Sequence, residues 1–129
     1  MLGKSGITKV SGVSVNQILA TPNLQYSVSI IVGNSGVQAG SDGKKIIKAG
    51  TPLSGSLEAR TTPFVSADSS GDTSNATVIL LHDVDVTEGN ANGTALVFGF
   101  VDLNKLDSTT KALIDAKTKK ALNKITFIA

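Results

Sequence analysis

The chain has 129 residues, no cysteine and a formal net charge of +2, with a sequence pI near 9.0. This length suits a single domain, and the lack of cysteine excludes disulfides and thiolate metal sites. Aromatic residues make up 4% of the chain, so small apolar side chains must form most of the core. The weak, scattered positive charge argues against nucleic acid as a partner. No apolar run reaches the roughly 18 residues of a membrane span.

The first 22 residues combine glycine, serine and lysine with widely spaced aliphatic side chains. They are too few to form a core, yet alternating pieces such as Val13, Ser14 and Val15 could pair with the edge of another sheet. We expect residues 1–22 to form an extended arm, although a frayed terminus or a first strand of the domain itself fits the same pattern. The chain starts without the apolar core of a signal peptide, so we expect it to begin at Met1 and to be made in the cytoplasm.

Residues 23–32 alternate between apolar and polar side chains, which predicts a strand. One face would carry Tyr26, Val28, Ile30 and Val32. A glycine-rich loop follows, and Asp42 with Gly43 predicts a tight turn before a short strand over residues 45–48.

Turn-forming residues continue from Gly50 to residue 74. Pro52 interrupts the chain because its ring fixes φ and biases the preceding residue away from helix. A short extended piece would follow it. We expect residues 60–74 to form a long surface loop that contains one buried pair, Phe64 and Val65.

Two alternating apolar runs, residues 76–86 and 94–100, flank a turn-rich stretch and predict a β-hairpin. Asn92 and Gly93 are the predicted turn. The first run would place Leu80, Val84 and Val86 on one face and Ile79, Leu81, Asp83 and Asp85 on the other. The second run would place Leu96, Phe98 and Phe100 on one face.

The apolar period changes after residue 102. Asp107 or Ser108 could cap a helix of about three turns that ends near Asn123, with lysines gathered in its C-terminal half as a solvated cluster. Its apolar stripe would be Leu106, Leu113, Ala116 and Leu122. Residues 125–128 would return as a strand, so the element order predicts a mainly β domain with a helix closing one end.

One cluster, residues 82–85, contains side chains that could bind a metal or transfer protons. On a strand, His82 would lie on the opposite face from Asp83 and Asp85, which leaves no convergent set of three ligands. We expect His82 at the margin of the core and the aspartates at a strand end or an interface. The glycine-rich loop lacks the spacing of a phosphate-binding loop, and no nucleophile–base pattern is present. The sequence therefore predicts no enzyme activity, no cofactor and no metal.

Three segments in order resemble the head-decoration, or capsid-cementing, proteins of tailed bacteriophages of the lambda type. The first is residues 48–53, with the sequence KAGTPL. The second joins residues 78–86 to residues 95–100 as central strands around a turn. The third is residues 107–129, in which a short helix leads through a lysine-containing stretch to an apolar strand. The resemblance covers residues 23–129.

This resemblance implies an α+β, mainly β domain over residues 23–129, shaped as a small β-barrel or β-tulip with one short C-terminal helix and an N-terminal arm over residues 1–22. It implies a homotrimer on the outside of an expanded phage head, located in the virion and made in the host cytoplasm, with the major capsid protein as partner. The arm would add a strand to that protein through Ile7, Val10, Val13 and Val15. We expect deletion of residues 1–20 to leave a folded domain that no longer holds to capsids.

The alternative from another class is a small binding module, such as a carbohydrate-binding domain or the base of a virion fibre. Such a site needs an aromatic platform, for which the chain offers Tyr26, Phe64, Phe98, Phe100 and Phe127. If the strand assignment holds, Phe98 and Phe100 are expected to be buried. An enzyme would become credible again if His82 proved accessible, perturbed and flanked by carboxylates.

Overall fold

The structure, a computed structural model, describes residues 18–20 and 24–129. Its described part is mainly β, as the alternating pattern predicts, with short helices near the C-terminus. The strands are β2 (Tyr26–Val32), β3 (Ile46–Ile47), β4 (Pro52–Ser54), β5 (Val65–Ser66), β6 (Ser69–Ser70), β7 (Thr73–Ser74), β8 (Val78–Leu80), β9 (Val84–Asp85), β10 (Ala91–Asp102) and β11 (Ile125–Ile128). The helices are the 3-10 helix η1 (Leu103–Lys105), α1 (Ser108–Ala112) and α2 (Ala116–Ala121).

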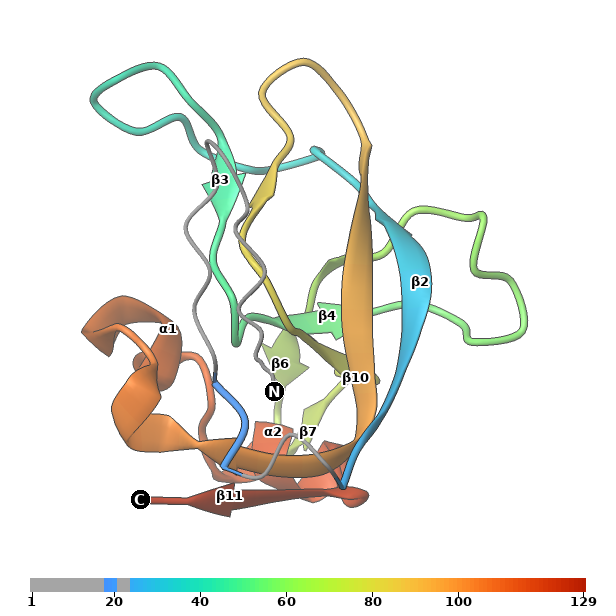
Figure 1. The fold of residues 1–129 in the computed structure, drawn as a ribbon, viewed down its shortest axis with the longest axis vertical. Helices are drawn as coiled ribbons and strands as arrows, with labels where there is room; N and C mark the ends of the chain where they lie inside the picture. The colour runs from blue at the N-terminus through green and yellow to red at the C-terminus, as the bar shows by residue number, and fades with distance from the viewer. Residues whose placement is uncertain (1–17, 21–23) are drawn as a thin grey trace, which may run out of the picture.

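The 12-residue strand β10 organises the fold, because β2, β8 and β11 all pair with it. Strand β2 runs antiparallel to it, in register from Val32 opposite Ala91 to Tyr26 opposite Phe98. Strand β8 is antiparallel, and β11 is parallel along residues 99–102. The main sheet has the order β11-β10-β8-β4-β5 with β2 on β10, and the pairs β3-β9 and β6-β7 are separate. Figure 1 shows β2 and β10 side by side over most of their length.

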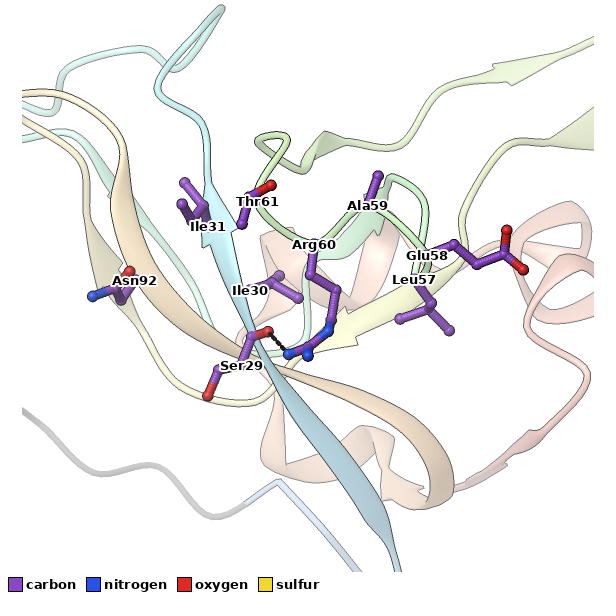
Figure 2. Close-up of a pocket in the computed structure, with 9 residues that line it drawn as sticks. All are labelled: Ser29, Ile30, Ile31, Leu57, Glu58, Ala59, Arg60, Thr61 and Asn92. Carbon is purple, nitrogen blue, oxygen red and sulfur yellow. Dashed lines mark hydrogen bonds between the residues drawn. The ribbon is translucent and has the colours of Figure 1, made fainter.

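Over the described residues the sheet does not close into a barrel, so the β-barrel that the resemblance implies is not formed. Strand β2 and Phe64, the residue before β5, meet at one isolated parallel bridge between Val32 and Phe64. There Phe64 N–H donates to the Ile31 carbonyl and Gly33 N–H donates to the Phe64 carbonyl, both at 2.8 Å. Residues 57–62 turn away from β2 before this bridge (Figure 2). We call the line between β2 and this segment the seam; it is open because the preceding residues form turns of their own.

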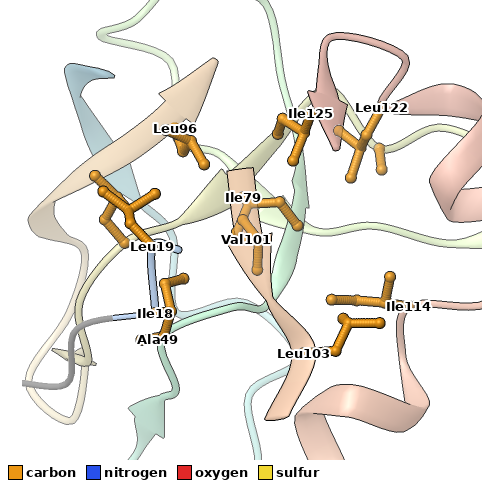
Figure 3. Close-up of a cluster of buried hydrophobic side chains, with 12 residues drawn as sticks. Ile18, Leu19, Ala49, Ile79, Leu96, Val101, Leu103, Ile114, Leu122 and Ile125 are labelled. Carbon is orange, nitrogen blue, oxygen red and sulfur yellow. The ribbon is translucent and has the colours of Figure 1, made fainter. Parts of the chain in front are cut away.

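Two hydrophobic clusters lie on opposite faces of β8, and the predicted alternation of the first apolar run is confirmed. Val78 and Leu80 belong to one cluster, and Ile79 and Leu81 to the other. Both faces of this strand are buried. Figure 3 shows the second of these clusters, which consists of Ile18, Leu19, Ala49, Ala76, Ile79, Leu81, Leu96, Val101, Leu103, Ile114, Leu122 and Ile125. The first cluster contains Phe64, which is fully buried, whereas its neighbour Val65 is exposed.

The two predicted runs pair antiparallel through β8 and β10, but β9 lies between them in the sequence and pairs with β3, so the hairpin is only partly formed and the turn predicted at Asn92 and Gly93 is wrong. Both residues lie inside β10, opposite Ile31 and Ile30 of β2. The chain turns instead over residues 87–90, where Gly89 has φ 137°. Glycine is needed at position 93 for space, because a Cβ there would lie 2.8 Å from a methyl group of Val32. The first run is also broken at residues 81–83, so β8 and β9 pair with different neighbours.

The predicted face of Leu96, Phe98 and Phe100 is wrong beyond Leu96. The β2–β10 register shifts between Leu96 and Phe98, so the strand contains a bulge. A bulge changes which face the following side chains occupy. Leu96 and Val101 therefore enter the same cluster, while Phe98 is 42% exposed and Phe100 is half-buried.

The single helix predicted after residue 107 is two helices. Asp107 caps α1 by accepting from Thr110 N–H at 2.7 Å, and Asp115 caps α2 by accepting from Thr118 N–H at 2.9 Å. A second capping residue starts a second helix, because its side chain satisfies the N–H groups that an uninterrupted helix would bond internally. The break leaves Leu113 exposed and buries Ile114, the reverse of the predicted stripe.

Candidate functional site

The proposed arm residues Ile7, Val10, Val13 and Val15 lie outside the described residues. The described residues 18–20, which we call the N-terminal anchor, belong to the folded domain. Ile18 and Leu19 are 1% and 4% exposed and pack in the cluster of Figure 3. Ala20 N–H donates to the Phe100 carbonyl and Asp102 N–H to the Ile18 carbonyl, each at 2.9 Å.

The anchor therefore continues, alongside β10, the pairing that β2 begins, with Leu19 opposite Val101 in an antiparallel bridge. The Lys105 ammonium also donates to the Leu19 carbonyl at 3.3 Å. Deletion of residues 1–20 would remove two side chains from the core. A deletion that tests the arm has to end at residue 17.

An aromatic patch, formed by Leu24, Tyr26 and Phe98, lies beside the anchor. Tyr26 is 61% exposed and lies directly opposite Phe98 in the β2–β10 register, so the two side chains share a face. Leu24 is also exposed. Phe100, the hydrogen-bond partner of Ala20, is two residues from Phe98 on the same strand. Patch and anchor thus occupy the same end of β10.

The predicted position of His82 at the core margin is wrong, because the chain leaves the sheet at residues 81–83 and His82 is exposed. Asp83 accepts from Ala49 N–H at 2.8 Å and lies 3.9 Å from the Lys48 ammonium. Asp85 accepts from the hydroxyl and the N–H of Thr87, and these hydrogen bonds lower its pKa. Both aspartates thus stabilise chain turns next to β9, in line with the predicted strand-end role.

Within residues 18–20 and 24–129, no group of three or more histidine and acidic side chains could hold a metal ion. The described helices are also too short and too polar to cross a membrane. A comparison of the sequence with models of known protein families and with curated proteins found no match.

A groove of about 430 Å³ follows the outer edge of β2, the edge that faces the seam. Its walls are β2 and the turn over residues 57–61, with Asn92 of β10 also in the lining. Figure 2 shows the Arg60 side chain reaching across the groove to Ser29. The guanidinium donates to the Ser29 carbonyl at 2.9 Å.

Sequence patterns gave no signal for Arg60, which lies in a segment predicted to be a surface loop. The sequence marks Tyr26 and Phe98 only as two of five aromatic residues that could form a binding platform. Their pairing depends on the strand register and on the bulge in β10, neither of which follows from the alternation alone.

Proposed function

We propose that the protein is a capsid decoration protein of a tailed bacteriophage, which binds the outside of the head as trimers and stabilises the shell by joining neighbouring major capsid proteins. The observation that supports this most is the position of the N-terminal anchor. The anchor packs in the core and is hydrogen-bonded to β10 at the end that carries the aromatic patch. A pull exerted by a bound capsid on residues 1–17 would therefore be transmitted directly to β10.

Capsid binding of this kind works through several weak contacts. In a trimer, three N-terminal segments and three aromatic patches face the shell. Once one has bound, the others bind at a high effective concentration, so modest individual contacts give a long-lived complex. The exposed Tyr26 and Phe98 suit this role because aromatic side chains contribute most to protein interfaces.

The test is co-sedimentation of the full chain with expanded phage heads that lack a decoration protein, scored for copies bound per head and for heat resistance of the shell. We expect saturable binding in multiples of three and a raised melting temperature of the shell. A variant lacking residues 1–17 keeps the anchor, so it is expected to fold and to lose binding. Full binding by this variant would exclude the arm mechanism, and no binding of the full chain to any head would exclude capsid decoration.

The aromatic patch is tested by the double variant Tyr26→Ser and Phe98→Thr. We expect it to weaken head binding at least about tenfold, the effect typical of an interface aromatic. Leu113→Ser is the matched control, since Leu113 is exposed to a similar degree but lies far along the chain, at the end of α1.

A second candidate function is favoured by the same pair of aromatic side chains. Two neighbouring exposed rings are also what a carbohydrate-binding module uses to stack sugar rings. Binding of the full chain to an immobilised polysaccharide, lost in the double variant and independent of residues 1–17, would support this function over capsid decoration.

A further inference from the structure

The outer edge of β2 has hydrogen-bonding groups without protein partners in the described part of the chain. The register shows which residues these are. Thr94 lies opposite Ser29, and the Thr94 carbonyl accepts from Leu81 N–H on the far side of β10. Paired residues of this type direct their backbone groups away from each other. The N–H and carbonyl of Ser29 therefore point to the seam, as do those of Ser27 and Ile31.

The Phe64 bridge identifies the positions that a longer parallel pairing would fill. Phe64 donates to the Ile31 carbonyl and accepts from Gly33 N–H. In a parallel ladder, the residue two positions before Phe64 would donate to the Ser29 carbonyl and accept from Ile31 N–H. That residue is Thr62, but its N–H donates to the Ala59 carbonyl at 3.0 Å instead. Pairing along the seam consequently ends at Phe64.

Arg60 takes the place of the missing strand at one position. Its guanidinium donates to the Ser29 carbonyl, which leaves the N–H groups of Ser29 and Ile31 without a described partner. A guanidinium has five N–H donors in a planar fork, and one is used here. No described carboxylate forms an ion pair with it; the Glu58 carboxylate points away in Figure 2.

We propose that the seam is a strand-addition site, which binds an extended peptide segment of a partner protein carrying one acidic side chain. Carbonyl groups of the peptide would accept from the N–H groups of Ser29 and Ile31, whose own carbonyls already accept from Arg60 and Phe64. At Ser27 the peptide would pair with both backbone groups, so that it fills the space between β2 and the turn over residues 57–61. Its carboxylate would pair with the guanidinium of Arg60, and the exposed Leu57 offers an apolar contact on the opposite wall.

Two features of the site select this occupant. Open backbone donors along an edge favour an extended backbone over a helix or a small molecule. A guanidinium with no described ion-pair partner favours a carboxylate as ligand, because its fork geometry matches a carboxylate and the resulting hydrogen bonds are charge-assisted. The volume of about 430 Å³ is in the range of ligand-binding clefts. This inference goes beyond the proposed function and needs no capsid.

The test uses the full chain and a fluorescein-labelled peptide of eight alternating valines and threonines with one central aspartate. Fluorescence anisotropy measures binding, and hydrogen exchange measured by NMR reports protection of the Ser29 and Ile31 amides. We expect saturable binding with protection at both amides. Replacing the aspartate by asparagine is expected to weaken binding about tenfold, as for loss of a charge-assisted hydrogen bond. In an Arg60→Gln variant the two peptides are expected to bind equally.

Ser29→Pro is the decisive variant, because it removes an N–H that faces the seam and none that bonds to β10. It is expected to abolish peptide binding, whereas Ser29→Ala, which keeps the N–H, binds as the parent does. A peptide with alternate N-methylated amides probes the same hydrogen bonds without altering the protein. The proposal is overturned if this peptide binds equally well, or if the Ser29 and Ile31 amides gain no protection. It is also overturned if the chain dimerises through this edge and Ser29→Pro makes it monomeric, since the occupant would then be a second copy.

Discussion

The two edges of β2 differ sharply although they belong to the same seven-residue strand. The inner edge pairs with β10 from Val32 to Tyr26, and among the described residues the outer edge pairs only beside Phe64. Side-chain alternation is identical for both edges, because hydrogen-bonding direction lies in the plane of the sheet and side chains point out of it. Apolar patterning therefore specifies that β2 is a strand and leaves open which of its edges has a partner.

The two edges of β2 also differ in their roles: one contributes to the stability of the domain and the other is available for recognition of another chain. Backbone groups that are paired inside the sheet contribute to folding, whereas groups left at an edge remain available to another chain. Variants on the inner edge are expected mainly to lower the free energy of unfolding, and variants on the outer edge mainly to weaken binding.

The largest effect is expected for Phe64→Ala, which tests what holds the two ends of the sheet together. The Phe64 ring is fully buried and lies against Gly55, where an added Cβ would be 2.5 Å from the ring. Removing a buried phenylalanine costs about 3–5 kcal/mol of the free energy of unfolding. Urea denaturation measures this loss, and Val65→Ala, at an exposed neighbouring site, is the control with an expected change below about 0.5 kcal/mol. A similar loss in both variants would refute packing of Phe64 as the link.

A pair of proline variants compares the two edges directly. Val28→Pro removes an N–H that faces β10, opposite Ala95, and is expected to cost about 2–3 kcal/mol through the lost hydrogen bond and the unpaired carbonyl left behind. Ser29→Pro removes an N–H that faces the seam and is expected to cost less than about 1 kcal/mol. Urea denaturation of the full chain would measure both changes in the free energy of unfolding. Equal losses would contradict the assigned direction of the backbone groups.

Gly93→Ala tests the packing between β2 and β10 with a single methyl group. The new Cβ would lie 2.8 Å from Val32 and 3.1 Å from Val84, so we expect a loss of about 2 kcal/mol from overpacking. Asn92→Ala, at the exposed neighbouring position, is expected to change stability by less than about 0.5 kcal/mol. If the two residues formed a turn, as the sequence alone suggests, both positions would need a positive φ and Asn92→Ala would also be costly. Thermal unfolding followed by circular dichroism distinguishes these results.

The smallest effect is expected at the α1 cap, away from both edges of β2. Asp107→Ala should cost about 1 kcal/mol near neutral pH, the usual value for a lost N-cap. Hydrogen bonds from the Thr110 hydroxyl and N–H lower the pKa of Asp107 in the folded protein. The cap therefore stabilises fully above the unfolded-state pKa near 4 and is lost as the pH falls through the folded-state pKa. The difference between the variant and the parent should shrink below about pH 4 in urea titrations; a constant difference down to pH 2 would contradict a charged cap.

Sequence patterns predicted the elements better than their connections. The alternation over residues 28–32 and 78–81 is present in the structure, as are the tight turn at Gly43 and the final strand β11, whereas Tyr26, predicted on the same face as Val28, is exposed. The Asp107 cap was also predicted. These features depend on nearby residues, whose period or turn chemistry can be recognised in a short window.

Errors arose where a distant neighbour decided the outcome. Gly93 has a turn-like sequence but lies in a strand, because Val32 and Val84 need the space that a side chain would fill. Phe98 follows the apolar alternation but is exposed, since a bulge intervenes. One error was local: Asp115 caps a second helix and divides the predicted one, which buries Ile114 instead of Leu113.

Side-chain period and turn chemistry are local properties of the chain, and they are enough to predict a mainly β domain with a small-residue core and a set of short strands. Tertiary structure alone decided which strands pair, that residues 18–20 belong to the core, and that the sheet stays open between β2 and Arg60. The physical reason is that pairing along an edge depends on backbone hydrogen bonds between distant segments, and every residue except proline carries the same backbone groups.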